Sequence, residues 1–236
     1  GQKPERSKVT HNASLRKTAI RRNFAPIDVN AISTFIGNDG TFNRDPVTLN
    51  SGFEWPKGSR KYANYASGIW LGGKVAGTLR VADADYNTEY DAGPIAAGTD
   101  PTASAWRVYK IRRGDDAVIN PDYATWPVSD GAPVLRNYSN TADSLDANGK
   151  KIPGIIGDMT VWAVFNDNNP SLHSSKGTAP LGIEVQLTAF AFNFSGPLGN
   201  TIFYKWKLIN KGGKHNRLDV FFNLVGCGPR GRIRRL

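Results

Sequence analysis

Four oxygen-bearing side chains alternate along one short stretch of the chain, at Asp83, Asp85, Asn87 and Glu89. Carboxylate and amide oxygens at this spacing are the ligands that calcium takes in proteins. The stretch is not an EF-hand loop, because Thr88 stands where that loop needs glycine and Pro94 stands where its last carboxylate belongs. An acidic, solvated strand end is the alternative interpretation. We expect no cofactor, with calcium as the candidate ion.

A second oxygen-rich loop, Asn-Asp-Asn-Asn at residues 166–169, follows a run of apolar residues. Its carboxylate, Asp167, is a candidate ligand contact. The alternative is an Asx turn, in which the side chains accept hydrogen bonds from their own backbone.

Side chains for nucleophilic catalysis are not assembled at the spacing that known motifs require. His11, His173 and His215 lie in unrelated contexts, and no serine sits in a Gly-x-Ser-x-Gly elbow. Cys227 is the only cysteine, so the chain forms no internal disulfide and no cysteine-type zinc site. Neither a phosphate-binding loop nor a dinucleotide fingerprint is present. We therefore expect a protein that is not an enzyme.

The six tryptophans are candidates for a platform on which sugar rings stack. Trp70, Trp162 and Trp206 lie in alternating apolar patterns, which favours the core. Trp55 and Trp126 lie beside prolines in loops, so we expect them to be exposed. Together with Asp167, they are the candidate contacts for a glycan.

The elements that must position these residues are strands. Apolar residues alternate with polar residues over 183–191 and again over 202–208, and the turn residues of 195–200 lie between the two stretches. This period of two predicts a hairpin of two long strands, each with one buried and one wet face. Similar patterns predict strands at 31–37, 67–75, 78–84, 105–112, 160–166 and 218–225, with a tight turn at Ala76-Gly77.

The sum of these patterns predicts a mainly β fold, an antiparallel β-sandwich of jelly-roll-like or immunoglobulin-like type with long loops and little helix. We expect a basic, partly irregular amino-terminal arm over 1–30, a single sandwich domain over 31–227 and a basic tail over 228–236. A loop-rich insertion is expected near 114–155, with short helices near 121–126 and 141–147. No apolar run is long enough for a transmembrane segment.

The net charge of +10 comes from the two ends of the chain. Basic residues gather within 1–22 and at Arg230, Arg232, Arg234 and Arg235, while acids and bases balance between them. A binder of nucleic acid would carry a basic stripe on the folded part, so we expect no nucleic-acid partner.

Several longer motifs resemble a known group of proteins. They are FEWPKGS at 53–59, YASGIWLGGKV at 65–75, LRVA at 79–82, DMTVWAVFND at 158–167, PLGIEV at 180–185 and FYKWKLINKG at 203–212. They are similar to the amino-terminal β-rich region of large secreted surface proteins of Bacteroidota and Ignavibacteria, which commonly end in a type IX secretion sorting domain. The resemblance covers roughly residues 31–217 and departs after Asp219, so we expect a truncated, frame-shifted or processed carboxyl end.

The resemblance implies export and an extracellular or outer-surface location, and it brings no assigned activity. We therefore expect a non-enzymatic structural or assembly protein that associates with itself or with other surface proteins through strand edges or terminal arms. The alternative is a glycan-binding module of a larger secreted protein.

Overall fold

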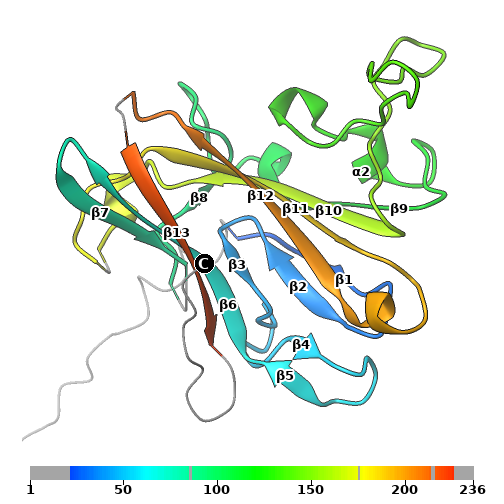
Figure 1. Ribbon diagram of the computed structural model, residues 1–236, viewed down its shortest axis with the longest axis horizontal. Helices are drawn as coiled ribbons and strands as arrows, with labels where there is room; N and C mark the ends of the chain where they lie inside the picture. Colours follow the sequence, from blue (N-terminus) through cyan, green and yellow to red (C-terminus); the bar gives the residue numbers. More distant parts are fainter. Residues whose placement is uncertain (1–21, 85–86, 175, 214–215, 226–236) are drawn as a thin grey trace, which may run out of the picture.

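The chain folds into two β-sheets that pack face to face (Figure 1). The computed structural model describes residues 22–84, 87–174 and 176–213, together with the backbone of 216–225. It is mainly β with little helix, and every strand pair is antiparallel. The expected antiparallel β-sandwich is confirmed.

The first sheet has six strands, in the order β1-β2-β3-β6-β13, with β7 paired to β6. These are β1 (Phe24–Ile27), β2 (Thr34–Gly37), β3 (Thr41–Phe42), β6 (Ala66–Val75), β7 (Thr78–Asp83) and β13 (Asn216–Val225). The turn between β6 and β7 places Ala76 and Gly77 at positive φ, as the predicted tight hairpin requires. Strand β1 lies inside the range expected to be a partly irregular arm, and it joins residues 24–27 to the first sheet.

The second sheet has five strands, in the order β12-β11-β10-β8, with β9 also paired to β10. These are β8 (Asp91–Ala92), β9 (Tyr109–Arg112), β10 (Met159–Asn166), β11 (Ile183–Ala191) and β12 (Ile202–Asn210). Strands β11 and β12 form the predicted hairpin, with Leu187 opposite Trp206. A small two-stranded sheet, β4 (Phe53–Glu54) with β5 (Tyr62–Asn64), extends from the first sheet (Figure 1).

The main hydrophobic core lies between the two sheets. Ile69 and Leu71 of β6 face Val161 and Phe165 of β10 in one buried cluster, and none of these four side chains is more than 1% exposed. Burial of such side chains contributes about 1.5–3 kcal/mol each, which makes this layer the main source of stability.

A second cluster covers the outer face of the second sheet. Trp162 and Val164 point away from the main core and pack against Trp126 and Ala132, which come from the insertion at 114–155. For this reason β10 is buried along its whole length. The insertion therefore forms a third layer over the sheet, at the upper right of Figure 1.

Short helices punctuate the loops. They are η1 (Ser104–Trp106), α2 (Pro121–Ala124), η2 (Val128–Asp130), η3 (Pro170–Leu172) and η4 (Pro197–Asn200). The helix expected near 121–126 is present as α2, with the Asn120 side chain accepting from the Asp122 N–H as its cap. The helix expected near 141–147 is absent, and isolated bridges such as Leu145 with Lys151 take its place. Among the described helices, none has the length and hydropathy of a membrane span.

Candidate functional site

Trp55 is exposed, as expected, with 46% of its surface accessible. It lies in the turn between β4 and β5, and its indole N–H donates to Asn200 Oδ1 at 2.7 Å. This hydrogen bond ties the turn to η4 at the lower end of the molecule in Figure 1. Trp126 lies in the insertion at the opposite end, so the structure does not bring the two tryptophans together.

Trp126 is buried, with 4% of its surface accessible, so the expectation that it is exposed is wrong. Its ring packs edge-on against Tyr109 at 6.2 Å, and its indole N–H donates to the Pro133 carbonyl at 2.8 Å. The proline beside it marked a loop correctly. The loop folds back onto the sheet, however, and the ring becomes the anchor of the insertion. Its edge reaches a shallow hollow of about 390 Å³ beside Lys150.

Asp167 is fully buried and holds the backbone of the next strand. Its carboxylate oxygens accept from the N–H groups of Leu181 at 2.6 Å and Ile183 at 2.7 Å. Burial raises the pKa of Asp167, and these hydrogen bonds oppose the rise. Asn166, the preceding residue, makes the Asx turn by accepting from the Asn168 N–H. Asp167 is therefore a structural residue that presents no oxygen to a ligand.

The acidic stretch tested for calcium is split by its surroundings. Asp83 and Glu89 are buried, Asn87 is exposed, and Asp85 lies outside the described residues. Asp83 pairs with Lys176 at 2.8 Å, and Glu89 accepts from the backbone N–H groups of Asp83 and Lys176, each at 3.2 Å. Within the described part of the chain, no group of three or more His, Cys, Asp or Glu side chains is placed to hold a metal ion.

His173 joins these two acidic regions. Its Nε2 lies 2.7 Å from the Asp167 carbonyl oxygen, and its Nδ1 lies 3.6 Å from Glu89 Oε2. The ring is buried, and it links the loop after β10 to the loop after β7. The contact at Nε2 joins the ring to the backbone at Asp167, whereas Nδ1 has no hydrogen-bond partner among the described residues. The cluster has a structural explanation that requires no substrate.

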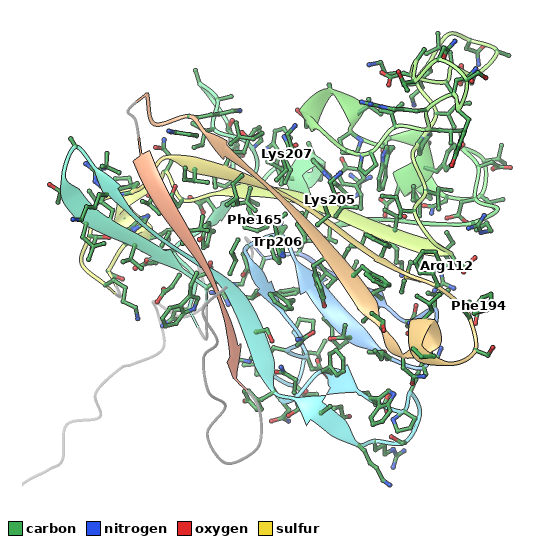
Figure 2. The ribbon with its side chains drawn as sticks, viewed as in Figure 1. Arg112, Phe165, Phe194, Lys205, Trp206 and Lys207 are labelled. Carbon is green, nitrogen blue, oxygen red and sulfur yellow. The ribbon has the colours of Figure 1, made fainter. Side chains whose placement is uncertain are left out.

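A groove that the sequence did not reveal lies between the insertion and the outer face of β11 and β12. It has a volume of about 610 Å³. Its floor is made by Gln186, Thr188, Lys205 and Lys207, and its apolar wall includes Val134 and Ile155. Figure 2 shows Lys205 and Lys207 on the side of β12 that faces the insertion, with Trp206 on the opposite side towards Phe165.

The floor contains polar side chains that are buried, although the alternating pattern of β11 predicts that they are exposed to solvent. Gln186 and Thr188 of β11 are 7% and 6% exposed, because the insertion lies over them. The Gln186 amide donates to the Asp130 carbonyl at 2.8 Å, which docks the insertion on the sheet. The Gln186 Oε1 atom is buried under Gly131 and accepts no hydrogen bond within the described residues. The predicted wet face of β11 is thus wrong, whereas β12 does expose Lys205 and Lys207.

Strand β12 is the edge of its sheet in the described structure. The Lys211 N–H donates to the Gly182 carbonyl at 2.9 Å. This bond shows which residues of β12 direct their backbone groups towards β11 and which direct them away. Alternate pairs such as Thr188 with Lys205 therefore exchange the bonds between β11 and β12. By the same alternation, Ile202, Tyr204 and Leu208 direct their N–H and C=O groups towards the open side. Their side chains are only half-buried against the main core.

Comparison of the chain with protein-family models, with curated proteins and with solved structures gave no match. The groove and the edge of β12 are two features of the described structure that a partner or ligand can reach. Two features of the sequence point to the groove: the lysines at alternate positions of β12 and the long insertion at 114–155. No local pattern in the sequence shows that the insertion folds onto the same face of the sheet.

Proposed function

We propose that the chain is a non-enzymatic structural module of a secreted or cell-surface protein, and that it assembles with a neighbouring protein by adding a strand to the edge of β12. The observation that carries the proposal is this edge, which pairs with β11 alone among the described strands and directs backbone groups of Ile202, Tyr204 and Leu208 outwards. The resemblance of residues 31–217 to secreted surface proteins supports the location.

The non-enzymatic character is supported by the use that the fold makes of its ionisable side chains. Asp167, His173 and Glu89 are buried, and each holds a loop rather than facing the groove. The groove itself presents lysines without a carboxylate or histidine beside them, apart from Asp143, which pairs with Lys151 at 2.8 Å. General acid–base catalysis needs a group that reaches the substrate and titrates near neutral pH.

The open edge selects the chemistry of its partner. An added strand takes main-chain hydrogen bonds from the residues that direct N–H and C=O outwards, and its side chains alternate between the two faces. On the inner face it would cover Tyr204 and Leu208, which favours apolar residues. On the outer face it would lie beside Lys205 and Lys207, which favours acidic residues. The partner is an extended segment that alternates apolar and acidic residues.

The same lysines disfavour association with a second copy of this chain. In an antiparallel self-pairing centred on Trp206, Lys205 of one copy lies opposite Lys207 of the other, and like charges directly opposite destabilise a sheet. Lysines on an edge strand are a common protection against such pairing. The purified chain is therefore expected to be monomeric on its own, and to bind a strand of opposite charge.

A pair of synthetic peptides tests the proposal. One has ten residues that alternate valine and glutamate, and the other has lysine in place of glutamate. The wild-type chain should bind the acidic peptide, and the K205E/K207E variant should prefer the basic one. Each cross-strand charge pair contributes about 0.2–1 kcal/mol, so reversing both should change the preference by about tenfold or more. Equal binding of both peptides, or of neither, would contradict the proposal.

A backbone variant separates strand addition from simple charge attraction. Leu208→Pro removes an N–H that points to the open side, whereas Leu208→Ala removes the same side chain and keeps the N–H. The proline variant should lose binding of the acidic peptide and the alanine variant should keep most of it. Similar binding by the two variants would show that the peptide does not extend the sheet. Circular dichroism of both variants confirms that they are folded.

A further inference from the structure

The groove beside the insertion has the features of a ligand site that is separate from the strand edge. Its floor is the face of β11 and β12, so a bound molecule there lies across side chains and does not continue the sheet. The volume of about 610 Å³ is in the range of sites for small organic ligands. The insertion supplies apolar wall residues such as Val134 and Ile155, whereas the floor and rim carry charged and amide side chains, so the groove is more polar than most sites for small ligands.

The charge of the groove is positive and partly uncompensated. Arg136 and Lys151 share the carboxylate of Asp143, at 3.7 and 2.8 Å. Lys205 and Lys207 are exposed, and among the described residues neither forms an ion pair or a hydrogen bond through its side chain. Two residues along a strand span about 6.6 Å, so the two ammonium groups can reach neighbouring anionic groups of one ligand. The ligand is therefore an anion with more than one charged group.

Thr188 adds a hydroxyl that forms no hydrogen bond with another described residue. The residue is 6% exposed, and its hydroxyl has no hydrogen-bond partner within the described chain. It lies directly opposite Lys205 in the sheet and lines the groove. The hydroxyl is not among the polar atoms that are sealed from water, so a ligand in the groove that offers a hydroxyl group can replace water as its partner. This feature favours a polyhydroxylated ligand.

Aromatic rings continue the same face beyond Thr188. Phe190 of β11 and Phe203 of β12 are stacked, with ring centroids 5.2 Å apart and an interplanar angle of 11°. Phe192 packs edge-on against Phe203 at 5.9 Å. All three are only half-buried. Flat apolar surface next to a hydroxyl and two cations is suited to the C–H face of a sugar that also carries a carboxylate.

We propose that this groove binds a short segment of an acidic polysaccharide, such as a chain of uronic acid residues. Lys205 and Lys207 neutralise adjacent carboxylates, Thr188 hydrogen-bonds a sugar hydroxyl, and the apolar wall with Val134 covers the ring faces. An acidic peptide is the less suitable occupant, because the groove floor offers no open strand edge to its backbone. A nucleic acid needs a longer basic stripe than these few side chains supply.

Isothermal titration with a tetramer of galacturonic acid, compared with a tetramer of glucose, tests the proposal. The acidic tetramer should bind, and raising the salt concentration from about 50 to about 300 mM should weaken it roughly three- to tenfold, because exposed charges are screened. The neutral tetramer should not bind measurably. Absence of binding by the acidic tetramer, or equal binding of the two, would overturn the proposal.

Variants locate the site. Lys205→Ala with Lys207→Ala should lower the affinity at least tenfold, whereas Lys61→Ala with Lys74→Ala removes the same charge from exposed positions elsewhere and should leave it unchanged. Thr188→Val removes only the hydroxyl and should lower the affinity about three- to tenfold without lowering the melting temperature. An equal loss of affinity in the two double variants would show that binding depends on net charge alone, and would reject the groove as the site.

The groove and the strand edge share the two lysines, but their tests separate. Leu208→Pro should abolish binding of the acidic peptide and leave the galacturonate tetramer bound. Thr188→Val should weaken the tetramer and leave the peptide bound. Loss of both ligands in either single variant would show that the two sites are not distinct, and would refute the groove as an independent site.

Discussion

The contact between Gly131 and Gln186 decides whether the insertion is docked on the sheet, and a glycine substitution tests it. Gly131 has a φ of 103°, and a methyl group built on it would overlap the Gln186 amide. Gly149, in the same insertion, has a φ of 77°, and a methyl group there would meet no atom within 4 Å. Alanine at either position pays for a left-handed backbone, but only alanine at 131 collides with the sheet.

The two costs can be estimated separately. Placing alanine in the left-handed region costs about 1–2 kcal/mol, and this term applies to both variants. At 131 the methyl group meets the end of the Gln186 side chain, and displacing that amide breaks its bond to the Asp130 carbonyl, which adds about 0.5–1.5 kcal/mol for Gly131→Ala alone. We therefore expect Gly149→Ala to lower the free energy of unfolding by about 1–2 kcal/mol and Gly131→Ala to lower it by about 1.5–3.5 kcal/mol.

Urea denaturation followed by tryptophan fluorescence measures both values, because Trp126 and Trp162 report on the packed insertion. A double-mutant cycle adds a stricter test. Gln186→Ala removes the atoms that collide, so the Gly131→Ala cost should fall by about 0.5–1.5 kcal/mol in that background. Equal costs at 131 and 149, or no coupling to Gln186, would refute the docking of the insertion and the groove that depends on it.

Three further outcomes follow from the burial and the charges. Trp126→Ala should lower the free energy of unfolding by about 3–5 kcal/mol through the cavity that it leaves, whereas Trp55→Ala should cost under about 1 kcal/mol, as measured by urea denaturation. Burial raises the pKa of Asp167 above its ordinary value of 3.8. The stability that Asp167 contributes is therefore fully present below pH 3.8 and declines as pH rises through the pKa of the folded state. The stability difference between wild type and Asp167→Asn should therefore shrink as pH rises from about 3 to about 7. A difference that grows with pH would show that burial does not raise the pKa of Asp167. Lys205→Glu alone should promote dimers in analytical ultracentrifugation, because a pairing centred on Trp206 then sets the introduced carboxylate of one copy opposite Lys207 of the other; an unchanged monomer at high concentration would contradict that register.

The periodicity of the chain was sufficient to predict the strands. Apolar alternation located β6, β10, β11 and β12 to within a residue or two, because each has at least one continuous row that faces the main core, and the tight turn at Ala76-Gly77 located β7. It missed β1, since the four residues of that strand include a proline and carry no alternation. Local pattern therefore describes a strand well when the strand is long.

The site could not be predicted to the same degree, because it depends on contacts distant in sequence. Gln186 and Thr188 are polar and alternate with apolar residues, which is the pattern of a solvated face. They are buried because the insertion folds over them, and nothing local encodes that. Trp126 was assigned to the surface for the same reason. Asp167 was correctly placed in a turn, but its partners lie 14 and 16 residues further along the chain.

The most direct test of the proposed assembly is amide hydrogen exchange along β12, measured by nuclear magnetic resonance with and without the peptide that alternates valine and glutamate. In the free chain, the amides of Lys205 and Lys207 should be protected by their bonds to β11, whereas those of Ile202, Tyr204 and Leu208 should exchange rapidly. Addition of the peptide should protect these last three and leave the lysine amides unchanged. Binding of the peptide without protection of Ile202, Tyr204 and Leu208 would contradict strand addition at this edge.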